Sequence, residues 1–566
     1  MKTLLPLMIA VVAAAGTAGN NDVLLSAMND ELARTVTQLH IEKHDKPYYV
    51  SYAVDDCNSL NMTASFGAIT YDRSFRWRTS SVDVHVGSYS MDSGNVGNNF
   101  SFWDVSDSGN FPVEDDYDAI RHKLWLQTDS AYKRAVQNLE KKKASNLQKN
   151  VKDRPDDWSH EEPVVSIQEK EPFAPDAASW KASIKKLSTV FKNYPKIRES
   201  SVAFSENASY RYFINNEGSK SREPLTSCTI TVSATAQGKD GIKAESSFIA
   251  AAINEKKLPS NDQLEAKAKQ LAQRLSEAVD AKELDIYQGP VLFEGEAAAT
   301  FFAKALAPKV VAERTPDSDR PFRTESPVQD RVGRRILPTF IDVIDDPKMK
   351  DASGDKILGS YDVDNEGVRA KQVTVVEKGI LKTLLSTRLP TRKVKVSNGH
   401  ATGSGSIAEI SNLVVQTANP ASPEELRAKL RQLGTDEGLE YVLVVRKMGA
   451  LSSNGGGAIY FSGGSRNQRD QVNLPVAVDV SRIYVLDGHE EPVRPTEFSG
   501  ATMRILRDIV ATGADSQTYP LTEHNDTLTT PSVIVTDVEM HEAHGDTDKN
   551  PILPHPYFEE KKMTAD

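Results

Sequence analysis

Short apolar runs separated by turn residues dominate the second half of the chain and restrict it to a strand-rich fold. Each run has the length of a strand or of a strand with its turn, and most are too short for a helix. Asp487-Gly488 directly after one run is typical of a tight hairpin. Two helices are predicted among the runs, from Pro423 to Leu433 and from Phe498 to Thr512. The runs occupy residues 373–376, 412–416, 441–447, 458–461, 476–486 and 532–535.

The first half mixes helical and strand patterns. Asp22 is a predicted N-cap, because apolar residues recur after it at three- and four-residue steps as far as Leu39. Ser260 and Gln263 form a capping box for a later helix. Other helices are predicted over 129–143 and 179–194, and strands over 48–54, 61–71, 81–89, 200–205, 210–215 and 227–236. The predicted fold class is α+β: an N-terminal α/β domain with helices on a sheet, followed by a strand-rich C-terminal domain.

A chain of 566 residues is too long for one ordinary hydrophobic core. The stretch 143–178 is rich in Lys, Asp, Glu and Pro without apolar periodicity, which is typical of a linker or an excursion. We therefore expect a signal peptide over 1–18, an N-terminal α+β region over 19–142, a charged linker or excursion over 143–178, the remainder of the N-terminal domain over 179–310, a strand-rich C-terminal domain over 311–540 and an irregular tail over 541–566.

The first residues have the pattern of a secretory signal. Lys2 precedes a short apolar run over 4–15, and Gly16-Thr17-Ala18 offers a small-residue cleavage site. We therefore expect an exported protein, periplasmic or extracellular, although an uncleaved anchor is the alternative. No later run reaches the roughly 20 apolar residues of a membrane helix, so no span is expected after signal removal.

Charge and cysteine content exclude two further classes of function. The net charge of -11 disfavours nucleic acid as a partner, because phosphate binding requires concentrated Lys and Arg. Cys57 and Cys228 are too few for a four-cysteine zinc site. They could pair in an oxidising compartment or remain independent buried thiols, and the sequence leaves both open.

The histidines offer two candidate sites. His541, Glu542, His544 and His555 could hold zinc in principle, but Gly and Pro residues around them predict a solvated loop rather than a rigid site. His400 lies in a Gly-rich loop, which is either a plain turn or a place where a peptide backbone approaches closely.

Two Gly-rich segments fail as other active-site motifs. Residues 454–457 lack the helix and Lys of a phosphate loop, and residues 403–406 lack the serine position of a nucleophile elbow.

Six segments follow one another between about residues 199 and 538 in an order typical of one protein family. They are Gly289-Pro290-Val291-Leu292-Phe293 leading into Glu296-Ala297-Ala298-Ala299, then residues 361–368, 376–381, 398–403, 455–457 and 483–488. Together they resemble the TldD/PmbA family of zinc peptidases, also called modulators of DNA gyrase. The resemblance implies that family's two-part fold, with the residues matching its metal motif in 179–310.

The resemblance also implies where zinc would lie. In the catalytic branch, two His of a His-Glu-x-x-x-His helix and a Cys near the C-terminus hold zinc, and the Glu serves as base. The matching positions here are Gly295, Glu296 and Thr300, and residues 511–525 contain no Cys. Only Glu296 is retained, so the chain resembles the PmbA-like branch, and no zinc or other cofactor is predicted.

By the same resemblance, we expect a non-catalytic subunit that binds peptide or unfolded polypeptide. Its predicted partner is a catalytic TldD-like relative, or a second copy through self-association. Two alternatives stay open: an active metallopeptidase with non-standard metal ligands, for which zinc would be required, and a structural envelope protein.

Overall fold

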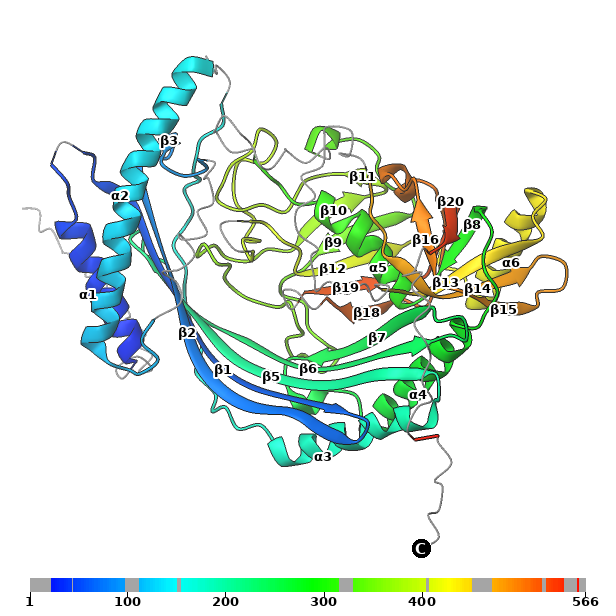
Figure 1. The fold of residues 1–566 in the computed structure, drawn as a ribbon. Helices are drawn as coiled ribbons and strands as arrows, with labels where there is room; N and C mark the ends of the chain where they lie inside the picture. Colours follow the sequence, from blue (N-terminus) through cyan, green and yellow to red (C-terminus); the bar gives the residue numbers. More distant parts are fainter. Residues whose placement is uncertain are drawn as a thin grey trace, which may run out of the picture.

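The computed structural model describes residues 22–42, 44–96, 111–149, 154–314, 329–403, 407–449, 471–521, 526–543 and 557–558. A long curved sheet with helices on its outer side forms the first half, and two smaller sheets form the second half on the inner side of that curve (Figure 1). The named helices are α1 (Val23–Gln38), α2 (Tyr117–Lys149), α3 (Ala177–Ser188), α4 (Asn261–Ala278), α5 (Glu296–Ala305) and α6 (Pro423–Asp436).

The first sheet is built around four long antiparallel strands in the order β2-β1-β5-β6. Short strands complete it: β3 extends β2, while β4 and β7 both pair with β6. The strands are β1 (Pro47–Ser65), β2 (Ala68–Ser88), β3 (Met91–Asp92), β4 (Val165–Ile167), β5 (Ile197–Asn215), β6 (Lys220–Gln237) and β7 (Lys243–Ala252).

The strands of this sheet are longer than the sequence pattern predicted. The predicted strands over 48–54 and 61–71, and those over 200–205 and 210–215, are not separate, since β1 and β5 run through the gaps between them. The single predicted strand over 61–71 was also wrong, because the chain turns at residues 66 and 67 between β1 and β2. Cross-strand partners explain the difference. Arg211 pairs with Asp55 at 2.7 Å, Arg78 pairs with Asp56 at 3.1 Å, and Ser205 of β5 donates to Asn61 at 2.7 Å. These Asp and Asn side chains usually favour turns, but here their hydrogen-bonding groups have partners within the sheet.

The two faces of the sheet have different roles. Even-numbered residues of β1 pack under the helices: Val50, Tyr52 and Val54 share a core with α1 and α2, and Leu60 and Met62 share one with α3 and α4. Because side chains alternate along a strand, the odd-numbered residues face the second half of the chain. We call this inner side the concave face.

The two cysteines do not pair. Both are free and buried. Cys228 belongs to the core under α3 and α4. Cys57 is an odd-numbered residue of β1 and therefore lies on the concave face.

One helix lies between the two sheets of the second half. Buried side chains of α5 share a core with both sheets, and α6 covers the outer side of the third sheet. The second sheet has the order β11-β10-β9-β12-β19-β18 and the third β13-β8-β20-β16-β14-β15, with β17 on β20. Their strands are β8 (Tyr287–Phe293), β9 (Ile341–Asp345), β10 (Val373–Glu377), β11 (Ile380–Leu381), β12 (Asn412–Thr417), β13 (Tyr441–Gly449), β14 (Val476–Tyr484), β15 (Glu490–Val493), β16 (Thr496–Ser499), β17 (Ile509–Thr512), β18 (Gln517–Pro520), β19 (Thr527–Thr530) and β20 (Val533–Glu542).

The predicted helix over 498–512 is wrong. That stretch forms β16, a short 3-10 turn (Met503–Leu506) and β17. Phe498 pairs with Met540 and Ile509 with Val535, so the long strand β20 draws both ends of the stretch into its sheet. The predicted strand over 458–461 and the signal segment over 1–18 lie outside the described residues.

The stretch 143–178, predicted as a linker or excursion, starts within α2, which extends to Lys149. Farther on, Trp158 is buried and β4 adds a parallel strand to β6. The domain boundaries themselves stay predictions. No helix in the described ranges is long and apolar enough to cross a membrane.

Candidate functional site

The helix that carries Glu296 begins where β8 ends. Gly295 is the residue before the helix and adopts φ 57° and ψ -122°, a backbone region that residues with a Cβ avoid. Glu296 follows as the first helical residue, where the positive end of the helix dipole favours a carboxylate. The next turns bury Ala297, Ala298, Ala299, Phe301 and Phe302, so most of α5 is core.

A lysine pairs with Glu296. The Lys447 ammonium of β13 forms an ion pair with the Glu296 carboxylate, and the lysine side chain is only 14% exposed. Strand pairing explains the contact: β13 runs parallel to β8 with Val445 opposite Phe293, so the residues after these two emerge side by side. Sequence reasoning missed Lys447, because no local pattern links residues 151 positions apart.

Tyr519 and Ser532 complete the surroundings of Gly295. A Cβ at Gly295 would lie 3.4 Å from the Tyr519 hydroxyl, and the Gly295 N–H donates to Ser532 Oγ at 3.4 Å. Ser532 in turn donates to Asp515 at 2.6 Å. Burial, together with the charges of Asp515 and Glu296, raises the pKa of Tyr519 to about 12, so its hydroxyl stays protonated.

These residues do not fit zinc. Gly295 offers no ligand atom, and the Thr300 hydroxyl donates to the Glu296 carbonyl within its own helix at 2.9 Å. The Glu296 carboxylate already holds a cation in Lys447. Zinc requires imidazole, thiolate or carboxylate ligands in tetrahedral arrangement. Across the described residues, no three His, Cys, Asp or Glu side chains come close enough to hold a metal ion.

The two histidine candidates are not brought together. His541 lies on β20, where its Nδ1 contacts the Glu542 carbonyl, while His544 and His555 lie outside the described residues. His400 is completely buried, with Nε2 3.0 Å from Asp345 and Nδ1 against Asn398. His400 therefore supports its own turn and is not presented to a peptide. The Gly-rich residues 404–406 and 454–457 are not among those described.

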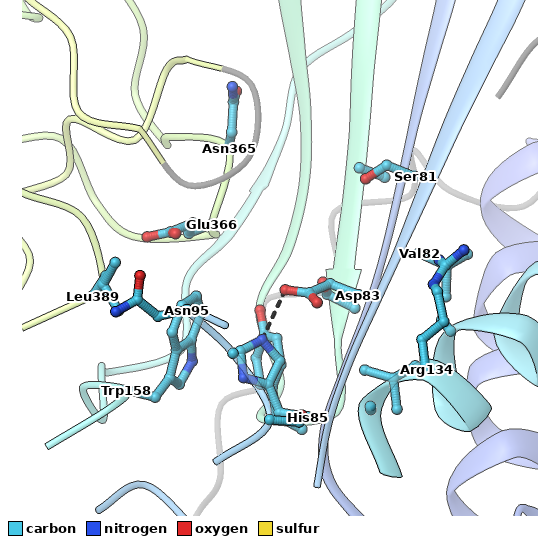
Figure 2. Close-up of a pocket in the computed structure, with 18 of the residues that line it drawn as sticks. Ser81, Val82, Asp83, His85, Asn95, Arg134, Trp158, Asn365, Glu366 and Leu389 are labelled. Atoms are coloured by element: carbon cyan, nitrogen blue, oxygen red, sulfur yellow. Dashed lines mark hydrogen bonds and ion pairs between the residues drawn. The ribbon is translucent and has the colours of Figure 1, made fainter. Parts of the chain in front are cut away.

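Two cavities separate the concave face from the loops of the second half. The larger has a volume of about 720 Å³ and the smaller about 340 Å³, and Arg211 and Asn365 line both. Figure 2 shows Asp83 and His85 on one side of the larger cavity, with Asn365, Glu366 and Leu389 on the other. The concave sheet face is therefore the floor of an internal space. Sequence reasoning did not find it, because its lining comes from segments hundreds of residues apart.

The buried imidazole of His85 lines the larger cavity and contacts two carboxylates. His85 contacts Asp92 through Nδ1 at 2.5 Å and Asp83 through Nε2 at 2.9 Å. Burial by itself lowers the pKa of His85, but the two carboxylates outweigh it and raise that pKa to about 10. His85 is thus protonated at neutral pH and holds Asp83, half of whose side chain remains exposed, toward the cavity.

Arg388 joins the two halves of the chain beside this cavity. Its guanidinium pairs with Glu217 at 2.6 Å, donates to the Ser159 carbonyl and lies over the Tyr49 and Trp158 rings. The Arg388 side chain is 1% exposed. The floor and roof of the cavity are therefore fixed to each other by a buried cation.

The strands that carry the neighbours of Glu296 contact the first sheet. β13, which carries Lys447, and β18, which carries Tyr519, both lie against β7 at the margin of the first sheet.

Comparisons with known proteins place the second half in one family. Residues 286–542 match the PmbA/TldA metallopeptidase C-terminal domain. A metalloprotease of Methanocaldococcus jannaschii is 26% identical over 224 residues, which are 40% of this chain and 46% of that protein. A metalloprotease PmbA homologue of Haemophilus influenzae is 34% identical over 115 residues, 20% of this chain and 22% of that protein. The chain thus matches less than half the length of either relative.

The similarity of fold extends over nearly the whole chain. The crystal structure of TldE from Thermococcus kodakarensis superposes with a TM-score of 0.60 at 14% identity, covering 91% of this chain and 100% of that one. The arrangement of a curved first sheet and a strand-rich second half is therefore shared.

Proposed function

Because this chain is a metallopeptidase-related member of the TldD/PmbA family through residues 286–542, we propose that it is a zinc-free, non-catalytic member that binds extended polypeptide. The observation that carries the proposal is the start of α5. There Gly295 and Thr300 stand at the positions of the metal ligands, and Lys447 pairs with the retained Glu296. A water molecule cannot be activated there by a metal that has no ligands.

The backbone at Gly295 supports the same conclusion. Its positive φ with strongly negative ψ is a conformation for glycine, so a histidine at this position would be strained. The departure from the zinc motif therefore extends to the local geometry of the chain.

The peptide-binding part of the proposal rests on the internal space. Its volume and its mixed polar and aromatic lining suit a short segment of extended chain. We propose that the polypeptide lies between the concave face and the loops that carry Asn365 and Glu366.

Partner and location complete the proposal. A subunit without its own hydrolytic centre gains a role by pairing with a catalytic relative that keeps His-Glu-x-x-x-His, or by self-association. The signal-like sequence over 1–18 supports export to the periplasm or the exterior.

Metal analysis of the purified chain tests the central claim. After dialysis, we expect no stoichiometric zinc and no peptide cleavage, with or without added zinc. Glu296→Gln should leave peptide binding unchanged. One tightly held zinc per chain, together with cleavage that Glu296→Gln abolishes, would instead establish the active metallopeptidase. Recovery of the chain without any family partner in a gentle pull-down would favour a structural envelope protein.

A further inference from the structure

The concave face changes character along its strands. Toward the larger cavity it carries charges, with Asp55 paired to Arg211 at 2.7 Å and Asp83 to His85 at 2.9 Å. Beyond Asp55, in the direction of the turn between β1 and β2, its side chains become neutral. The concave face therefore has a charged region beside the larger cavity and a neutral region toward the turn between β1 and β2.

The neutral region extends across five strands. Among its inner-face residues, Arg73 carries a charge, and its guanidinium lies over the Tyr71 ring at 5.8 Å from the ring centre. The remaining inner-face positions are Cys57, Ser59, Asn61 and Thr63 on β1, Phe75 and Trp77 on β2, Ser201, Ala203, Ser205, Asn207 and Ser209 on β5, Leu225, Ser227, Thr229, Thr231 and Ser233 on β6, and Ser247, Ile249 and Ala251 on β7. In a chain with 26% charged residues, this stretch is unusual.

Four side chains at its centre form a closed hydrogen-bond circuit. Ser59 donates to Asn207 at 2.7 Å, Asn207 to Ser205 at 3.3 Å, Ser205 to Asn61 at 2.7 Å, and Asn61 back to Ser59 at 2.7 Å. Each asparagine uses one of its two N–H donors in the circuit. The second N–H of each half-buried amide is therefore held in a fixed direction before any ligand binds.

An aromatic pair borders the circuit. Phe75 lies opposite Ser59 and Trp77 opposite Cys57 on the adjacent strand. The two ring centres are 5.1 Å apart, and Phe75 remains 46% exposed. An exposed Phe75 ring and a partly buried Trp77 ring beside fixed amides provide apolar contact and hydrogen bonding in one place, which is a common composition of binding surfaces.

We propose that this neutral patch, comprising Ser59, Asn61, Ser205, Asn207, Phe75 and Trp77, makes the protein selective for uncharged segments of extended polypeptide. The inference rests on the proposed peptide binding and names its substrate class. The backbone amides of a peptide can bond to the two asparagines, and its apolar side chains can pack on the rings. A positively charged side chain would lose its hydration there without gaining a partner of opposite charge. A negatively charged one would find only Arg73, which lies opposite Asn61 and over the Tyr71 ring.

Three matched peptides test the selectivity. The probe is a ten-residue peptide of Gly, Ser, Asn and one Tyr, acetylated and amidated so that it carries no charge. Two analogues replace two serines by Glu or by Lys. Calorimetric titration of the full chain should give at least tenfold tighter binding of the neutral peptide than of either analogue.

Two variants separate the patch from the rest of the molecule. Asn207→Asp keeps the shape but adds a negative charge, so binding of the Lys analogue should strengthen and binding of the Glu analogue should weaken. Trp77→Ala should weaken binding of the neutral peptide about tenfold. Trp125→Ala is the matched control, because Trp125 is exposed on α2 on the opposite side of the sheet. This variant should leave the affinity for all three peptides unchanged. Circular dichroism checks that each variant folds.

The possible failures are distinct. If no peptide binds at all, peptide binding is excluded and this inference falls with it. If all three peptides bind equally and Asn207→Asp changes none of them, the neutral patch does not select, although the protein binds peptide. If maltohexaose binds in a Trp77-dependent way and the peptides do not, the patch recognises sugar and the inference is overturned.

Discussion

At the scale of single residues, two charged side chains define the chemistry of the interior. Lys447 supplies a positive charge to Glu296 at the start of α5, and His85 supplies one to Asp83 and Asp92 beside the larger cavity. In both places the protein provides its own cation. This agrees with a site that needs no metal to neutralise its carboxylates.

His85 should make stability depend on pH in a definite direction. Its pKa is raised from 6.5 to about 10 in the folded protein, so its contribution is complete below about pH 6.5 and is lost as the pH rises toward 10. Urea unfolding at pH 6, 8 and 9.5 measures the loss. His85→Gln should flatten this decline relative to the wild type.

His489→Gln is the control for this measurement, because His489 is exposed in a hairpin and should leave the decline unchanged. Identical pH profiles for the wild type and His85→Gln would show that the carboxylates do not hold the imidazole protonated.

At the scale of elements, the connection between β8 and α5 determines which residues can occupy the position before Glu296. Gly295 turns the chain sharply, and the helix buries its alanine and phenylalanine face immediately afterwards. Packing therefore fixes the position of α5. The backbone of Gly295, which stands where the family has its first metal-binding His, is fixed in a conformation that favours glycine.

Substitution at Gly295 should be costly even though space is available. Gly295→Ala should destabilise the protein by about 1–3 kcal/mol, because the backbone there disfavours a Cβ. Thr300→Ala should cost less than about 0.5 kcal/mol, since alanine is the better helix former. Chemical denaturation measures both.

Restoring the family ligands should not restore the metal. The double variant Gly295→His/Thr300→His should bind no stoichiometric zinc, because of backbone strain, the Lys447 ammonium and the missing thiolate. Elemental analysis after dialysis measures the zinc content. Tight zinc binding by this variant would show that only two imidazoles separate the chain from a metalloenzyme.

At the scale of the whole molecule, Arg388 connects the curved sheet to the second half. It is buried with Glu217 from the loop after β5, the Ser159 carbonyl and two aromatic rings. A buried ion pair contributes little net stability, yet loss of one partner leaves an uncompensated charge.

Arg388→Met should therefore destabilise the protein by about 3–5 kcal/mol. Arg388→Lys should restore little of the lost stability, because the single nitrogen of an ammonium does not reproduce the planar fork with which the guanidinium contacts Glu217 and the Ser159 carbonyl. Urea unfolding and limited proteolysis check both. Adding Glu217→Gln to Arg388→Met should recover part of the loss. No recovery would indicate that Arg388 stabilises through ring packing alone.

The sequence by itself determined the local features of this protein. The caps at Asp22 and Ser260, the helix that begins at Pro423, the hairpin at Asp487-Gly488 and the α+β class are confirmed, because each depends on residues close together in the chain. The family resemblance is confirmed as well, since ordered short motifs survive low overall identity. Absence of zinc, export and the partner stay predictions.

Only the tertiary structure decided which distant residues meet. Asp55 and Asp56 have charged partners on neighbouring strands, and the two predicted strands on either side of them form one long strand. The pairing of Phe498 and Ile509 with β20 places them in a sheet rather than in the predicted helix. The pairing of Lys447 with Glu296 and the closure of the Ser59 and Asn207 circuit depend on strand register across more than a hundred residues. Such contacts follow from the global arrangement of the sheets, which no local pattern encodes.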